Sequence, residues 1–216
     1  MLKFLKAYYP LFPIIGMGSY LIVFTLAASA YPGGSENLPH APGYSFFHNF
    51  LCDVMDPITK GGVFNGARFM AVVSHLILSF TMVTFFYLLP EIFDHKNRNT
   101  KLIRFFGMLS MAVFVLMYTS YHDHIVTLTG IIGTFAMIPL MLELKHCPNK
   151  LLNLLAYWCF LLSVVVFFIF ETKLGFYYLP FLQKITFMFD ATWVIWVSLI
   201  VWKKNRELSE KLEMVY

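Results

Sequence analysis

The sequence predicts an all-α integral membrane protein, a single transmembrane domain over residues 1–216. The chain is 59% hydrophobic and only 13% charged, and 24 of its residues are phenylalanine. Six apolar runs are each long enough to cross a hydrocarbon core of about 30 Å as a helix of about 20 residues. These runs lack the alternation of apolar and polar residues that is typical of barrel strands. Because lipid offers the backbone no hydrogen-bond partners, each run is expected to be helical.

The six expected helices form a bundle with mostly short connections. Their approximate bounds are 11–31, 68–89, 102–121, 125–144, 151–170 and 185–202. One connection is longer, a loop of residues 32–65 between the first two helices. The charged residues that follow position 202 are expected to continue the last helix briefly. Little of the chain is left for a soluble domain.

The lysines and arginines in the connections predict the orientation of the bundle. Twelve of the 16 basic residues, Lys3 and Lys6 among them, fall on the side of the N-terminus. Positive residues favour the cytoplasmic side, so we expect both termini inside and the protein in a bacterial inner (plasma) membrane. The basic residues flank the helices and form no stripe, and no glycine-rich phosphate loop is present. Nucleic acids and nucleotides are therefore not expected as partners.

The long outer loop is expected to contain a short interfacial helix. Residues 32–65 are too many for a simple hairpin connection. Ser45 is a suitable N-cap, and a helix from Ser45 to Asp53 would place Phe46 and Phe50 on one face. We expect this helix to lie in the outer interface and to cover a pocket.

Ionisable residues are concentrated in the outer half of the expected bundle. The run Tyr121-His122-Asp123-His124 lies between two apolar segments. Five of the seven histidines and half of the 12 acids belong to the outer half: His40, His48, His75, His122, His124, Glu36, Asp53, Asp56, Asp123, Glu171 and Asp190. The inner half is expected to hold almost no buried charge. Ionisable groups at membrane depth usually mark a functional site.

Metal-dependent hydrolysis is one chemistry that these residues could support. Zinc favours imidazole and carboxylate ligands and keeps one position open for water in catalytic sites. The candidate zinc ligands are His75, His122, His124 and Asp123, and the candidate catalytic residues are His75, Asp123, Asp190 and Ser74. Such a site would cleave an amide or ester bond in a membrane lipid.

Three other interpretations remain open. A proton- or ion-coupled transporter would use Asp190, His75 and Arg68 as relay groups. A binding protein that catalyses no reaction would hold a lipid headgroup through polar and aromatic residues. The candidate residues are His48, Asp53, Arg68, Tyr121, Glu171, Lys184, Tyr177, Tyr178 and Trp193. A structural subunit would dock partners through its aromatic surface, with His75 as an ordinary hydrogen-bonded residue and Arg68 paired with Asp190.

The loop motifs resemble those of a group of uncharacterised bacterial multi-pass membrane proteins of the domain-of-unknown-function type. The motifs are Tyr31-Pro32-Gly33-Gly34, Gly43-Tyr44-Ser45-Phe46, the run from Asn49 to Asp53, and Asn65-Gly66. This resemblance implies a six-helix fold and a functional outer loop, and it supplies no reaction.

The polar motifs are also similar to those of membrane hydrolases that include alkaline ceramidases and adiponectin-type receptors. Those proteins combine a serine, an aspartate and three histidines around zinc in seven helices. Ser74-His75 and His122-Asp123-His124 offer the same residue types, although here the serine and histidine are adjacent and one helix fewer is expected. The leading prediction is an outer polar pocket that binds or processes a lipid or small amphipathic ligand.

Overall fold

The computed structural model of this chain describes residues 8–213, with side chains through residue 210. Lys3 and Lys6, on which the expected orientation partly depends, lie outside the described residues. Within the described part the fold is helical, and its extended pairing is limited to isolated bridges in the long loop, such as the one between Ile58 and Phe64.

Six long helices make up the fold. They are α2 (Phe12–Ser29), α3 (Arg68–Leu88), α4 (Arg98–Phe114), α5 (His122–Glu143), α6 (Lys150–Thr172) and α7 (Leu179–Glu213). Short 3₁₀ helices adjoin or connect them: η1 (Tyr9–Leu11), η2 (Asp53–Met55), η3 (Leu89–Ile92), η4 (Val115–Tyr118), η5 (Leu144–His146) and η6 (Phe176–Tyr178). All six long helices are long and apolar enough to cross a membrane. The prediction of an all-α, multi-pass membrane protein is thereby confirmed.

Local sequence signals explain where several of these helices begin and end. Asn97 forms a capping box with Thr100, in which each side chain accepts a hydrogen bond from the other residue's backbone N–H. The Asn149 side chain caps α6 in the same way, by accepting from the Leu152 amide. Lys173 ends α6 in the left-handed conformation, with φ of 62°.

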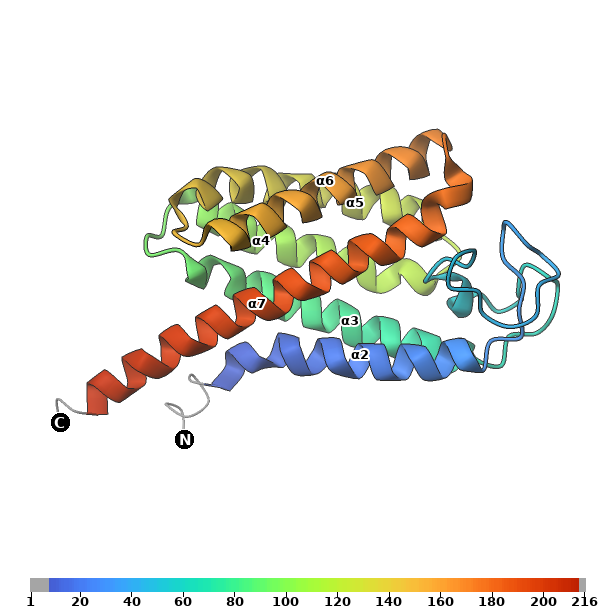
Figure 1. The fold of residues 1–216 in the computed structure, drawn as a ribbon, viewed down its shortest axis with the longest axis horizontal. Coiled ribbons are helices and arrows are strands. Elements are labelled where there is room, and N and C mark those ends of the chain that lie inside the picture. Colours follow the sequence, from blue (N-terminus) through green and yellow to red (C-terminus); the bar gives the residue numbers. More distant parts are fainter. Residues whose placement is uncertain (1–7, 214–216) are drawn as a thin grey trace.

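The six helices run antiparallel to their neighbours along the chain (Figure 1). In this view α2 begins and α7 ends at one end of the bundle, here called the terminal end. The long loop lies at the opposite end, here called the loop end. Helix α7 crosses the bundle diagonally. It packs its buried Trp193 against Phe85 of α3, with ring centroids 5.4 Å apart.

The long loop does not contain the continuous helix expected from Ser45 to Asp53. A single helical turn, in which the Asn49 amide donates to the Ser45 carbonyl, is followed by turns and then by η2. The reason is local, because the Asp53 side chain takes the Phe50 amide, which a continuous helix would bond to the Phe46 carbonyl. Asn49 Oδ1 accepts from the Ser45 amide at 2.8 Å, and Asp53 Oδ2 accepts from the Phe50 amide at 2.9 Å. We call residues 45–55 the roof.

The terminal end holds a buried carboxylate, contrary to the expectation that the inner half lacks buried charge. Glu143 is only 3% exposed. It accepts hydrogen bonds from His95 Nε2 at 2.9 Å, Asn97 Nδ2 at 2.8 Å and Asn99 Nδ2 at 2.7 Å. These bonds connect the segment between α3 and α4, and the first turn of α4, to the end of α5. They satisfy a charge that would otherwise be costly to bury.

Candidate functional site

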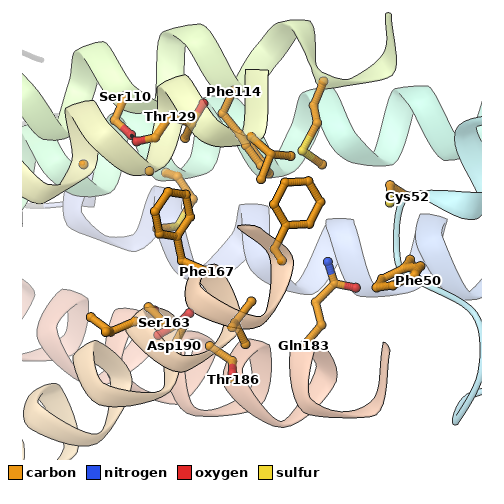
Figure 2. Close-up of a pocket in the computed structure, with 18 of the residues that line it drawn as sticks. Phe50, Cys52, Ser110, Phe114, Thr129, Ser163, Phe167, Gln183, Thr186 and Asp190 are labelled. Atoms are coloured by element: carbon orange, nitrogen blue, oxygen red, sulfur yellow. Dashed lines mark hydrogen bonds between the residues drawn. The ribbon is translucent and has the colours of Figure 1, made fainter. Parts of the chain in front are cut away.

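A cavity of about 1120 Å³ lies inside the bundle (Figure 2). Residues of α3, α4 and α5 line one side, and residues of α6 and α7 line the other. The cavity extends from the loop end to the buried Leu140 on α5. Beyond it, the buried Leu144 and Leu152 belong to the same apolar core as Leu140. The packed core therefore forms the base of the cavity at the terminal end.

The walls of the cavity are mainly apolar. They include Met82, Phe85, Met111, Phe114, Met137, Phe160, Phe167 and Val194. Polar side chains are fewer, and Figure 2 shows them on both walls. Ser110 and Thr129 lie on one side of Phe167, and Ser163 and Asp190 lie on the other.

Charged residues line the cavity where it reaches the loop end. Lys60 forms ion pairs with Asp56 at 3.6 Å and with Glu36 at 3.7 Å. Partial burial opposes the charged form of Lys60, but these nearby carboxylates outweigh it and raise the pKa of the lysine. From α5, the Asp123 carboxylate accepts a hydrogen bond from His122 Nδ1 at 2.9 Å. We call these loop-end lining residues, together with Lys173, the mouth.

The roof is attached to α7 by a buried polar network. Lys184 is 4% exposed, and its ammonium donates to the Asn49 carbonyl and, at 3.0 Å, to the Pro180 carbonyl. Gln183 Oε1 accepts from the Leu51 amide at 2.9 Å. Asp53 is 3% exposed, and its burial raises the pKa of the carboxyl despite hydrogen bonds that favour the ionised form. Phe50, Cys52 and Asp53 line the cavity from this side.

A second cavity of about 240 Å³ brings together three of the predicted catalytic residues. Ser74, His75 and Asp190 all line it, and Asp190 lines the large cavity as well. Asp123, the fourth predicted catalytic residue, lines only the large cavity.

The hydrogen bonds of Ser74 and His75 do not form a nucleophile–base pair. The Ser74 hydroxyl donates to the Ala71 carbonyl at 2.7 Å. His75 Nε2 lies 2.9 Å from the Phe114 carbonyl, so this nitrogen carries a proton and donates it. A serine nucleophile requires its hydroxyl to donate to an unprotonated histidine nitrogen. In this arrangement both groups instead bond backbone carbonyls.

The predicted metal ligands are distributed over separate places. Within residues 8–213, no three His, Cys, Asp or Glu side chains are grouped so that they could hold a metal ion. His122 and Asp123 lie at the mouth, His75 lines the second cavity, and His124 is exposed on α5. The structure therefore does not support the expected zinc site.

The predicted ligand-binding residues are also divided. Asp53 lines the large cavity, whereas His48, Tyr121 and Glu171 are not among its lining residues. Tyr121 is 68% exposed. Glu171 accepts a hydrogen bond from Thr127 at 2.6 Å across α5 and α6.

Arg68 supports the roof and is not paired with Asp190. Its Nε donates to the Met55 carbonyl at 3.0 Å. The structural ion pair considered for Arg68 and Asp190 is thus not formed. Arg68 fixes the end of η2 to the start of α3.

Several cavity residues were not identified from the sequence as site residues. Ser110, Thr129, Ser163, Thr186 and Gln183 line the large cavity. Each lies in a mainly apolar helix. That signal was present in the sequence, but helical serines and threonines often bond their own backbone. Thr186, for example, donates to the Leu182 carbonyl at 3.0 Å.

Comparisons with known proteins identify no family for this chain. The resemblances suggested by the loop and histidine motifs therefore stay predictions. No family model, no curated protein and no solved structure matches the chain.

Proposed function

We propose that this membrane protein binds a lipid or another small amphipathic molecule in its large cavity. The observation that carries the proposal is a cavity of about 1120 Å³ with apolar walls and a charged mouth. Ligand pockets typically measure about 300–1000 Å³, so this cavity has room for a long apolar chain. The tail would lie along the phenylalanines and methionines, and polar groups would contact the mouth or the few polar wall residues.

The polar contacts are expected to decide which molecule is bound. Burying a methylene group from water contributes about 0.8 kcal/mol. A lipid tail that enters from the bilayer gains much less, because the bilayer is already apolar. Discrimination among membrane molecules must therefore come from the mouth and from polar wall residues such as Asp190.

Binding without a reaction is favoured over hydrolysis. Ser74 and His75 donate to backbone carbonyls, and the predicted zinc ligands are separated. We therefore propose a binding role and assign no catalytic residue.

The proposed setting is a bacterial inner membrane, with the mouth on the outer side and both termini in the cytoplasm. The excess of lysine and arginine in the segments at the terminal end supports this orientation. Lys203, Lys204 and Arg206, which lie near the end of α7, belong to this set.

The substitution Gly133→Leu tests the proposal by filling the cavity. Gly133 lies on α5 and lines the cavity, and the nearest atom to an added Cβ is Ser110 Oγ at 3.3 Å. Gly18→Leu on α2 is the matched control, because an added Cβ there meets nothing within 4 Å. Both changes raise helix propensity by the same amount, about 0.8 kcal/mol.

Lipids that copurify with each variant should be quantified by mass spectrometry. Gly133→Leu is expected to lose most of the bound amphipath, and Gly18→Leu is expected to retain the amount bound by the unmodified protein. Equal retention by Gly133→Leu would show that the cavity is not the binding site.

A further inference from the structure

We infer that the ligand is a cationic amphipath, a long-chain amine whose ammonium group binds Asp190. This inference rests on the proposed function, and it names the chemical class that the cavity selects.

Asp190 is an acidic residue deep in the bundle that faces open space. It lines both cavities, and its carboxylate contacts the thiol of Cys159 on α6. A buried acid at membrane depth favours its neutral form, and its carboxylate becomes favourable only when a cation or several hydrogen bonds compensate the charge. A single thiol is a weak donor and supplies little of that compensation.

The protein supplies no cation for Asp190 among its described side chains. No lysine, arginine or histidine nitrogen of this set lies within 4.0 Å of the Asp190 carboxylate. The basic residues nearest to the loop end are used elsewhere. Lys60 pairs with carboxylates at the mouth, and Lys184 and Arg68 donate to carbonyls of the chain. The Lys173 ammonium lies over the rings of Phe170 and Phe176. A cation that stabilises the Asp190 carboxylate is therefore expected to come from the ligand.

The charges that line the cavity favour the same class of ligand. Acidic residues outnumber lysines among the lining residues: the acids are Glu36, Asp53, Asp56, Asp123 and Asp190, and the lysines are Lys60 and Lys173. An excess of carboxylates in a cleft with apolar walls attracts cations and repels anions. A fatty acid, a phosphate ester or a sulfate ester would meet like charge at the mouth and again at Asp190.

The groups beside Asp190 suit an ammonium ion. Figure 2 shows Ser163 and Thr186 on the same wall as Asp190. An ammonium has three donors, so it could bond the carboxylate and also the oxygen of a neighbouring hydroxyl. Phe167 lies one helical turn from Ser163 on α6, so an aromatic ring is also present near this group.

Three C12 probes that differ only in the head group test the inference: dodecylamine, dodecanol and dodecanoate. Their binding should be measured by native mass spectrometry on the full-length protein in nanodiscs of zwitterionic lipid. Asp190→Asn removes the charge and keeps the shape of the side chain. Asp94→Asn is the matched control, because Asp94 is an exposed residue between α3 and α4 that pairs with Lys204.

We expect the unmodified protein and Asp94→Asn to bind dodecylamine about tenfold more tightly than dodecanol, and dodecanoate most weakly. Asp190→Asn should lose this preference and still bind dodecanol, which also shows that the variant retains its fold. Equal binding of dodecanoate and dodecylamine, or unchanged amine binding by Asp190→Asn, would overturn the inference and leave the cavity as a binding site. Binding of none of the three probes would overturn the proposed function as well.

Discussion

Replacing Asn49 with alanine is expected to release the roof from the mouth of the cavity. Asn49 is 1% exposed and makes three side-chain hydrogen bonds. Its Oδ1 accepts from the Ser45 amide at 2.8 Å. Its Nδ2 donates to the Gly34 carbonyl at 2.7 Å and to the Asp53 carboxylate at 2.9 Å. Alanine leaves all three partners without this bond in a site that water hardly reaches.

The magnitude follows from these three bonds. A bond between neutral groups contributes about 1 kcal/mol and a bond to a charged group about 2 kcal/mol, so the sum is roughly 4 kcal/mol. Other bonds of the Gly34 carbonyl and the Asp53 carboxylate soften the loss. We therefore expect the free energy of opening the roof to fall by about 3 kcal/mol, which lowers amide protection by a factor on the order of 100.

Hydrogen–deuterium exchange of the purified protein measures this change directly. The informative amides are those of Ser45 and Phe50, which donate to side chains within the roof. The control is Asn37→Ala, which removes one bond to the Tyr177 carbonyl from a partly exposed asparagine of the same loop. If both substitutions changed exchange in the roof to the same small extent, the account of Asn49 would be refuted.

Two further predictions concern buried carboxylates at opposite ends of the bundle. Glu143→Ala leaves the side-chain amides of Asn97 and Asn99 without their acceptor, and we expect the free energy of unfolding to fall by about 2–4 kcal/mol. The midpoint of thermal unfolding should fall accordingly. Glu207→Ala, at an exposed position, is the control, and similar midpoints for the two variants would contradict this role of Glu143. At Asp53, burial raises the pKa above its ordinary 3.8, so the carboxyl contributes stability that is present below 3.8 and lost as pH rises through the raised pKa. The asparagine in Asp53→Asn does not titrate. As pH rises above 3.8, the roof amides of this variant should therefore become more protected from hydrogen exchange relative to those of the unmodified protein. A difference in protection that did not change with pH would disprove the role of Asp53.

The helices could be predicted from the sequence because lipid imposes a simple rule on apolar runs of this length. The expected helix at 125–144 corresponds closely to α5 (His122–Glu143). The largest difference is in α7, which begins at Leu179 and not near residue 185. Its expected continuation past residue 202 is present and reaches Glu213. Its ends contain charged and polar residues, and hydropathy alone is a poor guide to where such a helix begins or ends.

The roof and the hydrogen bonds of the site were much less predictable. Ser45, Asn49 and Asp53 have the spacing of a capped helix, but the Asp53 side chain takes the Phe50 amide and so interrupts the helical pattern. The acceptor of His75 is a carbonyl of α4, which no local pattern identifies. Glu143 was overlooked because a single acid at the end of an apolar run is normally a solvated residue, and its burial depends on asparagines that lie over 40 positions away.

The attachment of the roof to α7 has a consequence for biosynthesis. Leu51 and Asn49 of the roof bond Gln183 and Lys184, which lie 132 and 135 positions later in the chain. The ribosome therefore completes the roof long before it makes the residues that hold the roof in place. Until α7 has been inserted, the nascent bundle lacks the α7 side of the cavity, and the roof is not yet held over it. The arrival of the C-terminal helix thus sets the earliest moment at which the cavity can be enclosed.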